Sequence, residues 1–351
     1  MTQHSNKILN IQALRGIAVI LVIAFHLQGN EAKYCHGYTI LPDFLTIGSS
    51  GVDLFFVISG FMMVTITSGC FQKTGAIYRF LYHRVTRIYP MYWFYSILML
   101  VIYLIQFRTG NNTRITSITS SFLLLPQSHL PLMVVGWTLV HEIYFYVVFS
   151  ILLAVHERWL LALLTIWGIA SIIGGLIPCE NVTIKLITNP LTLEFIFGCF
   201  IALIHFSKKP SLEFAKYLGW PLLFISFVGW LLAYSVCIKN GVQPVSSGWL
   251  RIVVFGIPSV LLLYALVTLE KYSSWLLPNW LISIGDASFS LYLSHLLIIA
   301  AIGRIWQKLG IVGFWVNGAV LGAMFLTVLP IGMASFRFIE RPLLKFARRF
   351  G

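Results

Sequence analysis

The chain has 351 residues, of which 58% are hydrophobic and only 10% are charged, and its mean hydropathy is +0.87. This composition excludes a soluble globular domain, because a soluble core cannot bury so large an apolar fraction. The formal net charge of +13 has no accompanying long basic run or nucleic-acid-binding motif. It therefore indicates anionic lipid headgroups and small anionic ligands as partners, and no nucleic acid.

Ten apolar segments predict ten membrane-crossing helices. A hydrocarbon core of about 30 Å requires roughly 20 predominantly apolar residues of helix. The expected spans are residues 11–28, 47–66, 91–107, 132–155, 159–177, 191–206, 217–236, 249–269, 281–303 and 311–333. The expected fold class is an all-α, polytopic membrane helix bundle. No connection is long enough to build a core of its own, so we expect a single domain over residues 1–351 and no appended soluble domain.

The distribution of basic residues predicts the orientation of these spans. If the N-terminus is inside, fifteen of the 24 Lys and Arg residues lie in inner segments and seven in outer loops, and Arg15 and Arg251 lie within spans. Because cytoplasmic loops carry the excess of basic residues, both termini are expected in the cytoplasm. The first span has an Arg within its apolar region and no small-residue cleavage site before Asn30, so we expect it to remain as an anchor.

Arg15 and His26 are the most informative pair in the first span. Eleven residues of helix advance about 16 Å and make three turns plus some 20°, so both side chains lie on one face at different depths. Ionisable residues inside a membrane span usually face the bundle interior and mark function. A snorkelling Arg with a structural His is the alternative reading. We expect Arg15 and His26 to belong to a catalytic site.

Carboxylates in later spans offer partners for His26. A carboxylate that fixes the tautomer of an imidazole and stabilises its protonated form supports a general base. Glu142 is the better candidate, and Asp53, near the outer end of the second span, is the alternative. His141 lies beside Glu142 and could compete with His26. The remaining charged residues within spans are as well explained by helix packing as by function; they are Glu194, Arg251 and Asp286.

A basic segment before the third span predicts an anion site at the inner face. Arg84 and Arg87 are three residues apart, so on a helix they lie side by side and can grip one phosphate in a bidentate way. Tyr89 lies beside them. An ordinary basic flank of a membrane span is the alternative. Together with the deep His26, the pair indicates a nucleotide-containing donor bound from the cytoplasm.

The five cysteines do not have the spacing of a metal site, and we expect no metal. Cys35, Cys179 and Cys237 fall in expected outer loops, where an oxidising compartment would permit one disulfide. The sequence does not choose the pair.

Several ordered motifs resemble the integral-membrane acyltransferase 3 family. The resemblance runs from residue 11 to about residue 345, so it covers almost the whole chain. It rests on Arg15 with His26, on the segments at residues 51–61 and 84–90, on Trp137-Thr138-Leu139-Val140-His141-Glu142-Ile143-Tyr144-Phe145-Tyr146, on residues 288–295 with Tyr292 and His295, and on Phe338-Ile339-Glu340-Arg341-Pro342. Thr138 stands where the family usually has Ser, and His141 at a position that is often Val.

The resemblance implies transfer of an acyl group from cytoplasmic acyl-CoA to a sugar on the far side of the membrane. Exopolysaccharide acetylases look most similar, which implies a multi-pass protein of the bacterial inner membrane. Acetyl-CoA would be the donor, a polysaccharide or lipid-linked sugar the acceptor, and other polysaccharide-assembly proteins would be partners. The catalytic residues would be His26, Glu142, Arg15 and Asp53; Arg84, Arg87 and Tyr89 would bind the donor; His141, Trp137, Tyr292 and His295 are further candidates.

The rival function is a transporter of a glycan or small solute, in which the buried His and carboxylates form a proton relay. The Arg pair and the ordered motifs favour the enzyme. The sequence leaves open the acceptor sugar, the acyl chain, the oligomeric state, and the choice between direct transfer and an acyl-histidine relay.

Overall fold

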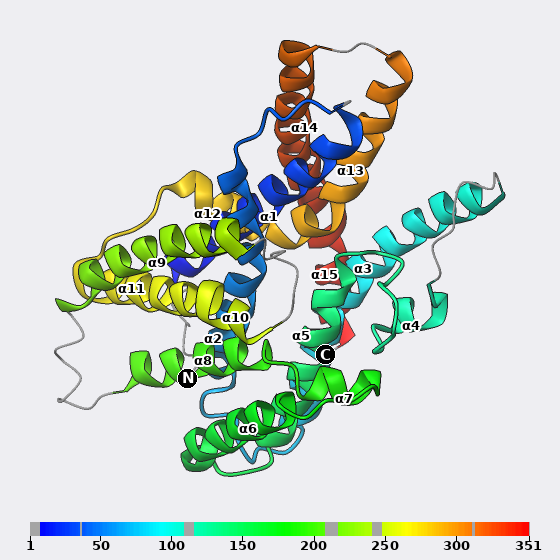
Figure 1. The fold of residues 1–351 in the computed structure, drawn as a ribbon. Helices are drawn as coiled ribbons and strands as arrows, with labels where there is room; N and C mark the ends of the chain where they lie inside the picture. Colours follow the sequence, from blue (N-terminus) through cyan, green and yellow to red (C-terminus); the bar gives the residue numbers. More distant parts are fainter. Residues whose placement is uncertain are drawn as a thin grey trace. The chain divides into compact units, whose positions relative to one another are not determined.

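The computed structural model describes residues 8–35, 37–108, 116–207, 217–240, 248–310 and 313–350. Within these ranges the chain forms helices, turns and irregular connections without any strand, which confirms the all-α prediction (Figure 1). Nine helical stretches of the described chain are long and apolar enough to cross a membrane, and a tenth apolar helix, α5, is shorter.

The longer helices follow the expected spans in chain order. They are α1 (Leu9–Tyr34), α2 (Ser50–Thr67) preceded by η1 (Asp43–Ser49), α3 (Ala76–Arg108), α5 (Gly136–Leu152), α6 (Leu160–Gly175), α8 (Thr192–Phe206), α9 (Gly219–Asn240), α11 (Ile257–Ser273), α13 (Ser288–Leu309) and α14 (Phe314–Ser335). The short helices are α4 (Ile118–Leu123), α7 (Val182–Ile187), α10 (Trp249–Arg251), α12 (Asn279–Asp286) and, after α14, α15 (Arg341–Ala347).

Two boundaries differ from the sequence expectation. Helix α3 begins at Ala76 rather than near residue 91, because Pro90 lies inside the helix instead of ending it; prolines are tolerated in membrane helices where other groups satisfy the freed backbone. The expected ninth span is divided, since α12 ends at Asp286 and Ala287 leaves helical geometry before α13 begins.

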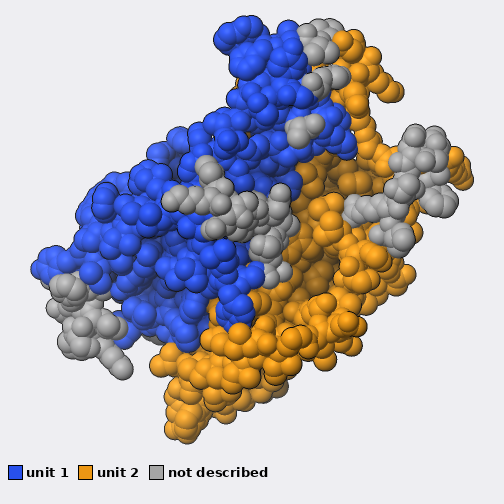
Figure 2. Space-filling view, viewed as in Figure 1, with its two compact units in different colours: residues 1–64, 194–288, 312–321 blue, residues 65–193, 289–311, 322–351 orange. Residues whose placement is uncertain are grey.

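The chain forms two compact units, coloured separately in Figure 2. Unit 1 comprises Met1–Val64, Glu194–Ser288 and Val312–Leu321, and unit 2 comprises Thr65–Leu193, Phe289–Ile311 and Gly322–Gly351. Each unit therefore combines segments that are distant in the sequence.

In unit 1, glycines let helix backbones approach closely. Gly60 of α2 meets the carbonyl of Phe195, and Gly198 of α8 meets the carbonyl of Val57, so neither position has room for a Cβ atom. Small residues at such crossings are how membrane helices gain packing energy, because lipid supplies no hydrophobic force between them. Helices α9 and α11 lie side by side in the same unit (Figure 1).

In unit 2, the tyrosines of α3 connect it to its neighbours. The Tyr92 hydroxyl donates to the Ser121 carbonyl at 2.6 Å, and the Tyr95 hydroxyl lies 2.7 Å from the Ser335 hydroxyl. Tyr82 donates to the carbonyl of Ala347 at 2.6 Å. These bonds satisfy polar groups internally, as the membrane environment requires.

Two π-helical segments interrupt the helices next to buried charges. The first, η4 (Ile252–Gly256), directly follows Arg251, and the second, η5 (Phe336–Glu340), ends at Glu340. Both charged residues are almost fully buried. Such segments occur often at functional sites because they change which side chains a helix presents inward.

Candidate active site

Helix α1 carries the expected pair on one uninterrupted helix. It runs from Leu9 to Tyr34, so Arg15 and His26 have the helical spacing predicted from the sequence, and both are half-buried. The His26 Nδ1 atom lies 2.8 Å from the Val22 carbonyl oxygen. A carbonyl only accepts, so Nδ1 carries the proton, and in the neutral ring Nε2 is the basic nitrogen.

Arg15 lies at a close crossing of α1 and α12. Gly16 meets the carbonyl of Leu281, and Gly285 meets the carbonyl of Gln12, so the two backbones are in direct contact. Arg15 precedes the first glycine of this crossing in the chain and Asp286 follows the second. The crossing therefore brings a basic and an acidic residue to the same part of unit 1.

Asp53 lies deeper than expected from the sequence. Gly48 meets the carbonyl of Leu21, and Gly51 meets that of Ala18, so η1 and α2 run antiparallel to α1. Continued in this register, Asp53 is level with Gly16, about 15 Å along the axis from His26.

The Asp53 carboxylate is bound by Arg251. Arg251 donates from Nε to one carboxylate oxygen at 2.9 Å and from Nη2 to the other at 2.6 Å. Its Nη2 also donates to the Ser49 carbonyl at 3.1 Å. The fully buried Glu194 lies in this cluster, and its carboxyl oxygens accept no hydrogen bond from any residue that the structure describes. This arrangement favours the packing interpretation of Arg251, and the catalytic role of Asp53 stays a prediction.

Glu142 belongs to a polar cluster in unit 2. The Tyr146 hydroxyl, one helical turn away on α5, donates to the Glu142 carboxylate. The Arg84 guanidinium of α3 lies over the Tyr146 ring, 5.8 Å from its centroid. Glu142 and His26 belong to different units, so their predicted pairing stays a prediction.

Arg87 faces a different partner from Arg84. Its guanidinium lies 3.1 Å from the Glu340 carboxylate, which is fully buried, and 5.9 Å from the centroid of the Phe289 ring. Ser290 donates to the second Glu340 oxygen at 2.6 Å. The sequence assigned no role to Glu340, although its position in the closing motif was the signal that could have done so.

The other candidates are held by local hydrogen bonds. The Tyr89 hydroxyl donates to the Leu123 carbonyl at 3.0 Å. Tyr292 lies 2.8 Å from the Thr138 hydroxyl, so the Thr that replaces the usual Ser retains a hydroxyl contact. The His295 Nδ1 lies 3.2 Å from the Leu291 carbonyl, and the His141 Nδ1 lies 3.0 Å from that of Trp137.

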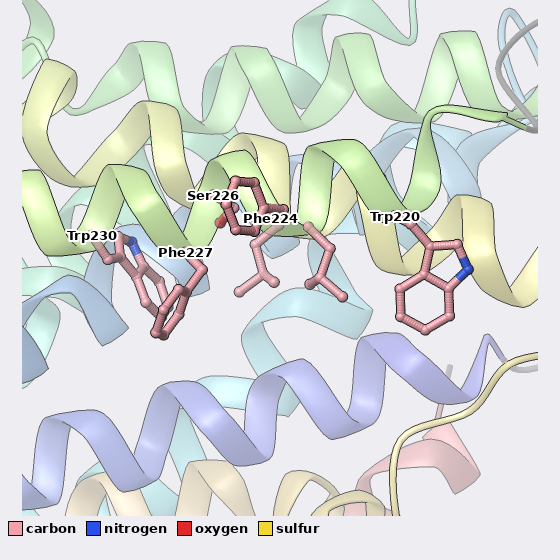
Figure 3. A pocket seen from close by; sticks show the side chains of 7 residues that line it. Trp220, Phe224, Ser226, Phe227 and Trp230 are labelled. Carbon is pink, nitrogen blue, oxygen red and sulfur yellow. The ribbon is translucent and has the colours of Figure 1, made fainter.

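Unit 1 also contains an apolar cavity of about 370 Å³ along α9 (Figure 3). Its lining is formed by Trp220, Leu223, Phe224, Ser226, Phe227, Trp230 and Leu262. The Ser226 hydroxyl donates a hydrogen bond to the Pro258 carbonyl at 2.8 Å. Trp220 and Phe224 are largely exposed. This apolar surface can contact a hydrocarbon chain, but its lining has no acidic or basic side chain that could take part in acyl transfer.

The structure also shows how possible metal ligands and the cysteines are arranged in the described residues. No group of three or more His, Cys, Asp or Glu side chains within the described ranges could hold a metal ion. Cys35 and Cys179 are free thiols, so they do not form the disulfide that the sequence permits. The Cys237 side chain lies outside the described residues.

Comparison with known proteins identifies the family. A model of an acyltransferase domain matches residues 8–336. The exopolysaccharide production protein ExoZ of Rhizobium meliloti (strain 1021) is 29% identical over 317 residues, which cover 86% of this chain and 92% of that protein. A putative O-acetyltransferase of Staphylococcus aureus (strain COL) is 23% identical, covering 95% of this chain and 57% of that protein.

The peptidoglycan O-acetyltransferase OatA of Listeria monocytogenes is 25% identical, covering 98% of this chain. The chain spans 57% of the length of that relative, as it does of the staphylococcal protein. No solved structure matches the chain. The family model covers nearly all of the chain, and the helices are those of a multi-pass membrane protein. The chain therefore belongs to the acyltransferase 3 family and is a membrane acyltransferase.

Proposed function

We propose that the protein transfers an acetyl group from cytoplasmic acetyl-CoA to a hydroxyl of a bacterial surface or exported polysaccharide, or of its lipid-linked precursor. Family membership supports the acyl transfer. The names of the relatives, exopolysaccharide production protein and O-acetyltransferase, support the acceptor and the acyl group. The protein would act in the inner membrane with both termini cytoplasmic, beside other polysaccharide-assembly proteins.

The observation that carries the proposal is the position of His26 on one uninterrupted helix with Arg15, with its Nδ1 held by a backbone carbonyl. Its Nδ1 is bound to the Val22 carbonyl, so Nε2 is free of the proton and can accept one. His26 then removes the proton of the sugar hydroxyl, the sugar oxygen bonds to the thioester carbonyl carbon, and the C–S bond breaks. The CoA sulfur takes up a proton, which balances the reaction. Transfer through an acyl-His26 intermediate would use the same nitrogen as nucleophile.

Arg15 and the α3 arginines would stabilise negative charge in this scheme. Arg15, about 16 Å along α1 from His26, would counter negative charge in the site. Arg84 and Arg87 hold donor phosphates, and their distinct partners keep the two guanidinium groups in fixed positions: Tyr146 for Arg84, Glu340 for Arg87. Tyr89 on the same helix would border the donor. Glu142 would orient His26, the pairing that the sequence predicts, and Asp53, which is paired with Arg251, would support the site.

Radiolabelled acetyl-CoA supplied to the purified protein in vesicles tests the proposal. The wild type should move label to a polysaccharide or lipid-linked acceptor, whereas a transporter would leave it on CoA. His26→Ala should lower transfer by about 10² or more, because that is the usual cost of losing a general base. His156→Ala, which removes an exposed histidine, is the matched control. Retention of more than about a tenth of the transfer rate in His26→Ala would remove His26 from the mechanism.

A further inference from the structure

Unit 2 contains a second cavity, of about 340 Å³, at the start of α3. Its lining differs from that of the α9 cavity because it contains basic side chains in addition to apolar ones. The lining consists of Ile66, Thr67, Cys70, Lys73, Thr74, Ala76, Arg79, Phe80, His83, Arg84 and Leu153. Ligand cavities usually have volumes of about 300 to 1,000 Å³, so this one fits a nucleotide-sized group.

The loop that forms one wall has a defined shape. Gly69, Gln72 and Gly75 have φ values of 68°, 57° and 74°, which turn the chain sharply three times within seven residues. The Gln72 amide donates to the Leu153 carbonyl at 2.9 Å and fixes the loop to the end of α5. The loop therefore holds Lys73 at the cavity without support from a ligand.

The basic side chains of the cavity have unused capacity for an anion. Lys73 and Arg79 form no ion pair with any residue of the described chain. The Arg84 Nε–H is buried and meets no acceptor within the described residues. The acidic Glu157 contacts the loop, where its carboxylate accepts from the Gly69 amide at 3.1 Å, but it does not line the cavity. The first turn of α3 adds its positive end, which favours phosphate.

We propose that this basic cavity binds the adenosine-phosphate end of the acyl-CoA donor. The inference rests on the proposed function and assigns Lys73 and Arg79 as phosphate ligands in addition to Arg84. Phe80, Ile66 and Leu153 supply the apolar surface that an adenine ring requires. Arg84 belongs both to this cavity and to the Tyr146 cluster, so the pantetheine arm would leave the cavity past Arg84.

Donor analogues test which part of the donor the cavity recognises. Wild-type protein should use acetyl-CoA with a KM roughly tenfold lower than that of acetyl-dephospho-CoA, which lacks the 3′-phosphate, because one charge-assisted contact is lost. In Lys73→Gln and Arg79→Gln, the KM for acetyl-CoA should rise and the ratio between the two donors should fall toward one. Lys345→Gln removes an exposed Lys outside the cavity and should leave the ratio unchanged.

Cys70 supplies a readout that does not need turnover. It is a free, half-buried thiol in the cavity lining, so its alkylation by a maleimide can be followed by peptide mass spectrometry in the native protein. Adenosine 3′,5′-bisphosphate should slow the labelling of Cys70, and pantetheine should not. The labelling of Cys179, which lies outside the cavity, should be unaffected by either compound.

The outcomes separate this inference from the proposed function. Acetyl transfer with an unchanged donor ratio and unprotected Cys70 would overturn the cavity assignment and leave the function standing. Protection of Cys70 without acetyl transfer would support the nucleotide site and overturn the reaction. Cys70 could instead be protected in phosphatidylglycerol vesicles and not in phosphatidylcholine vesicles, with no further protection by the nucleotide. That result would make the cavity a lipid headgroup site and overturn the proposal.

Discussion

Three histidines within helices share one local geometry. His26, His141 and His295 each place Nδ1 at 2.8–3.2 Å from the carbonyl oxygen four residues earlier. The helix itself thus selects the same tautomer for each of them, with Nε2 as the basic nitrogen. The preference for His26 therefore depends on its spacing from Arg15, because tautomer geometry does not distinguish the three.

Alanine substitution should rank these histidines. We expect His26→Ala to reduce acetyl transfer most, while membrane levels of the protein stay normal because alanine does not hinder insertion of an apolar span. His295 is fully buried, so His295→Ala should lower thermal stability along with activity. Transfer rates normalised to the folded protein measure the ranking. A larger loss in His141→Ala than in His26→Ala would move the assignment to His141.

The buried Asp53–Arg251 pair predicts a stability effect at the residue scale. Asp53→Asn leaves the Arg251 charge without its bidentate carboxylate in a buried site, and breaking such pairs costs about 3–5 kcal/mol. Glu194→Gln should cost much less, because it leaves the Asp53–Arg251 pair in place. Thermal unfolding in detergent micelles measures both. Equal stability of Asp53→Asn and wild type, with activity lost, would instead support a catalytic Asp53.

At the scale of elements, the helices were predictable and their ends were less so. Apolar length identified every long helix, because the membrane permits few alternatives. The start of α3 at Ala76 was missed because the basic residues before residue 91 do not count toward an apolar span, and Pro90 is tolerated inside the helix. The break at Ala287 was missed because residues 281–303 are long and apolar enough to read as one span despite Asp286. The crossing of α12 with α1 depends on Gly285, whose partner is remote in sequence.

The α2–α8 crossing makes a prediction at the same scale. Gly198→Ala places a methyl group against the Val57 carbonyl and should destabilise unit 1 by about 1–3 kcal/mol, the usual cost of overpacking. Gly322→Ala in α14 meets no atom within 4 Å and should be neutral or slightly stabilising, since Ala is the better helix former. Thermal unfolding of the two variants compares them directly. Matching losses would mean that the crossing is not tightly packed.

At the scale of the whole molecule, the sequence predicted the spacing of the candidate site residues better than it predicted their partners. The Arg15–His26 spacing and the Arg84–Arg87 pair depend on single helices, and the structure retains both spacings. The partners of these residues come from remote segments, as Glu340 does for Arg87, and no local pattern reveals them. The basic cavity could not be predicted from the sequence either, because it forms only where the turn of residues 68–75 meets the end of α5.

The orientation of the chain is a testable prediction at this scale. With both termini cytoplasmic, a single Cys at Lys73 should react only from the cytoplasm, and one at Lys185 of α7 only from outside. Both positions are exposed in the structure. Impermeant maleimide added to right-side-out and inverted vesicles measures the labelling, in a background whose native cysteines are replaced. Labelling of both from one face would contradict the route from cytoplasmic donor to external acceptor.

The π-helical segments beside Arg251 and Glu340 have a consequence for insertions and deletions. A π segment contains one residue more than the α-helical turn it replaces, and each residue turns a helix by about 100°. Deleting Val253 would convert η4 to regular helix and swing Arg251 away from Asp53, although the span would keep its length and apolar character. Loops usually tolerate changes in chain length. We expect the deletion of one residue to be tolerated least inside the two highly hydrophobic helical stretches that contain η4 and η5.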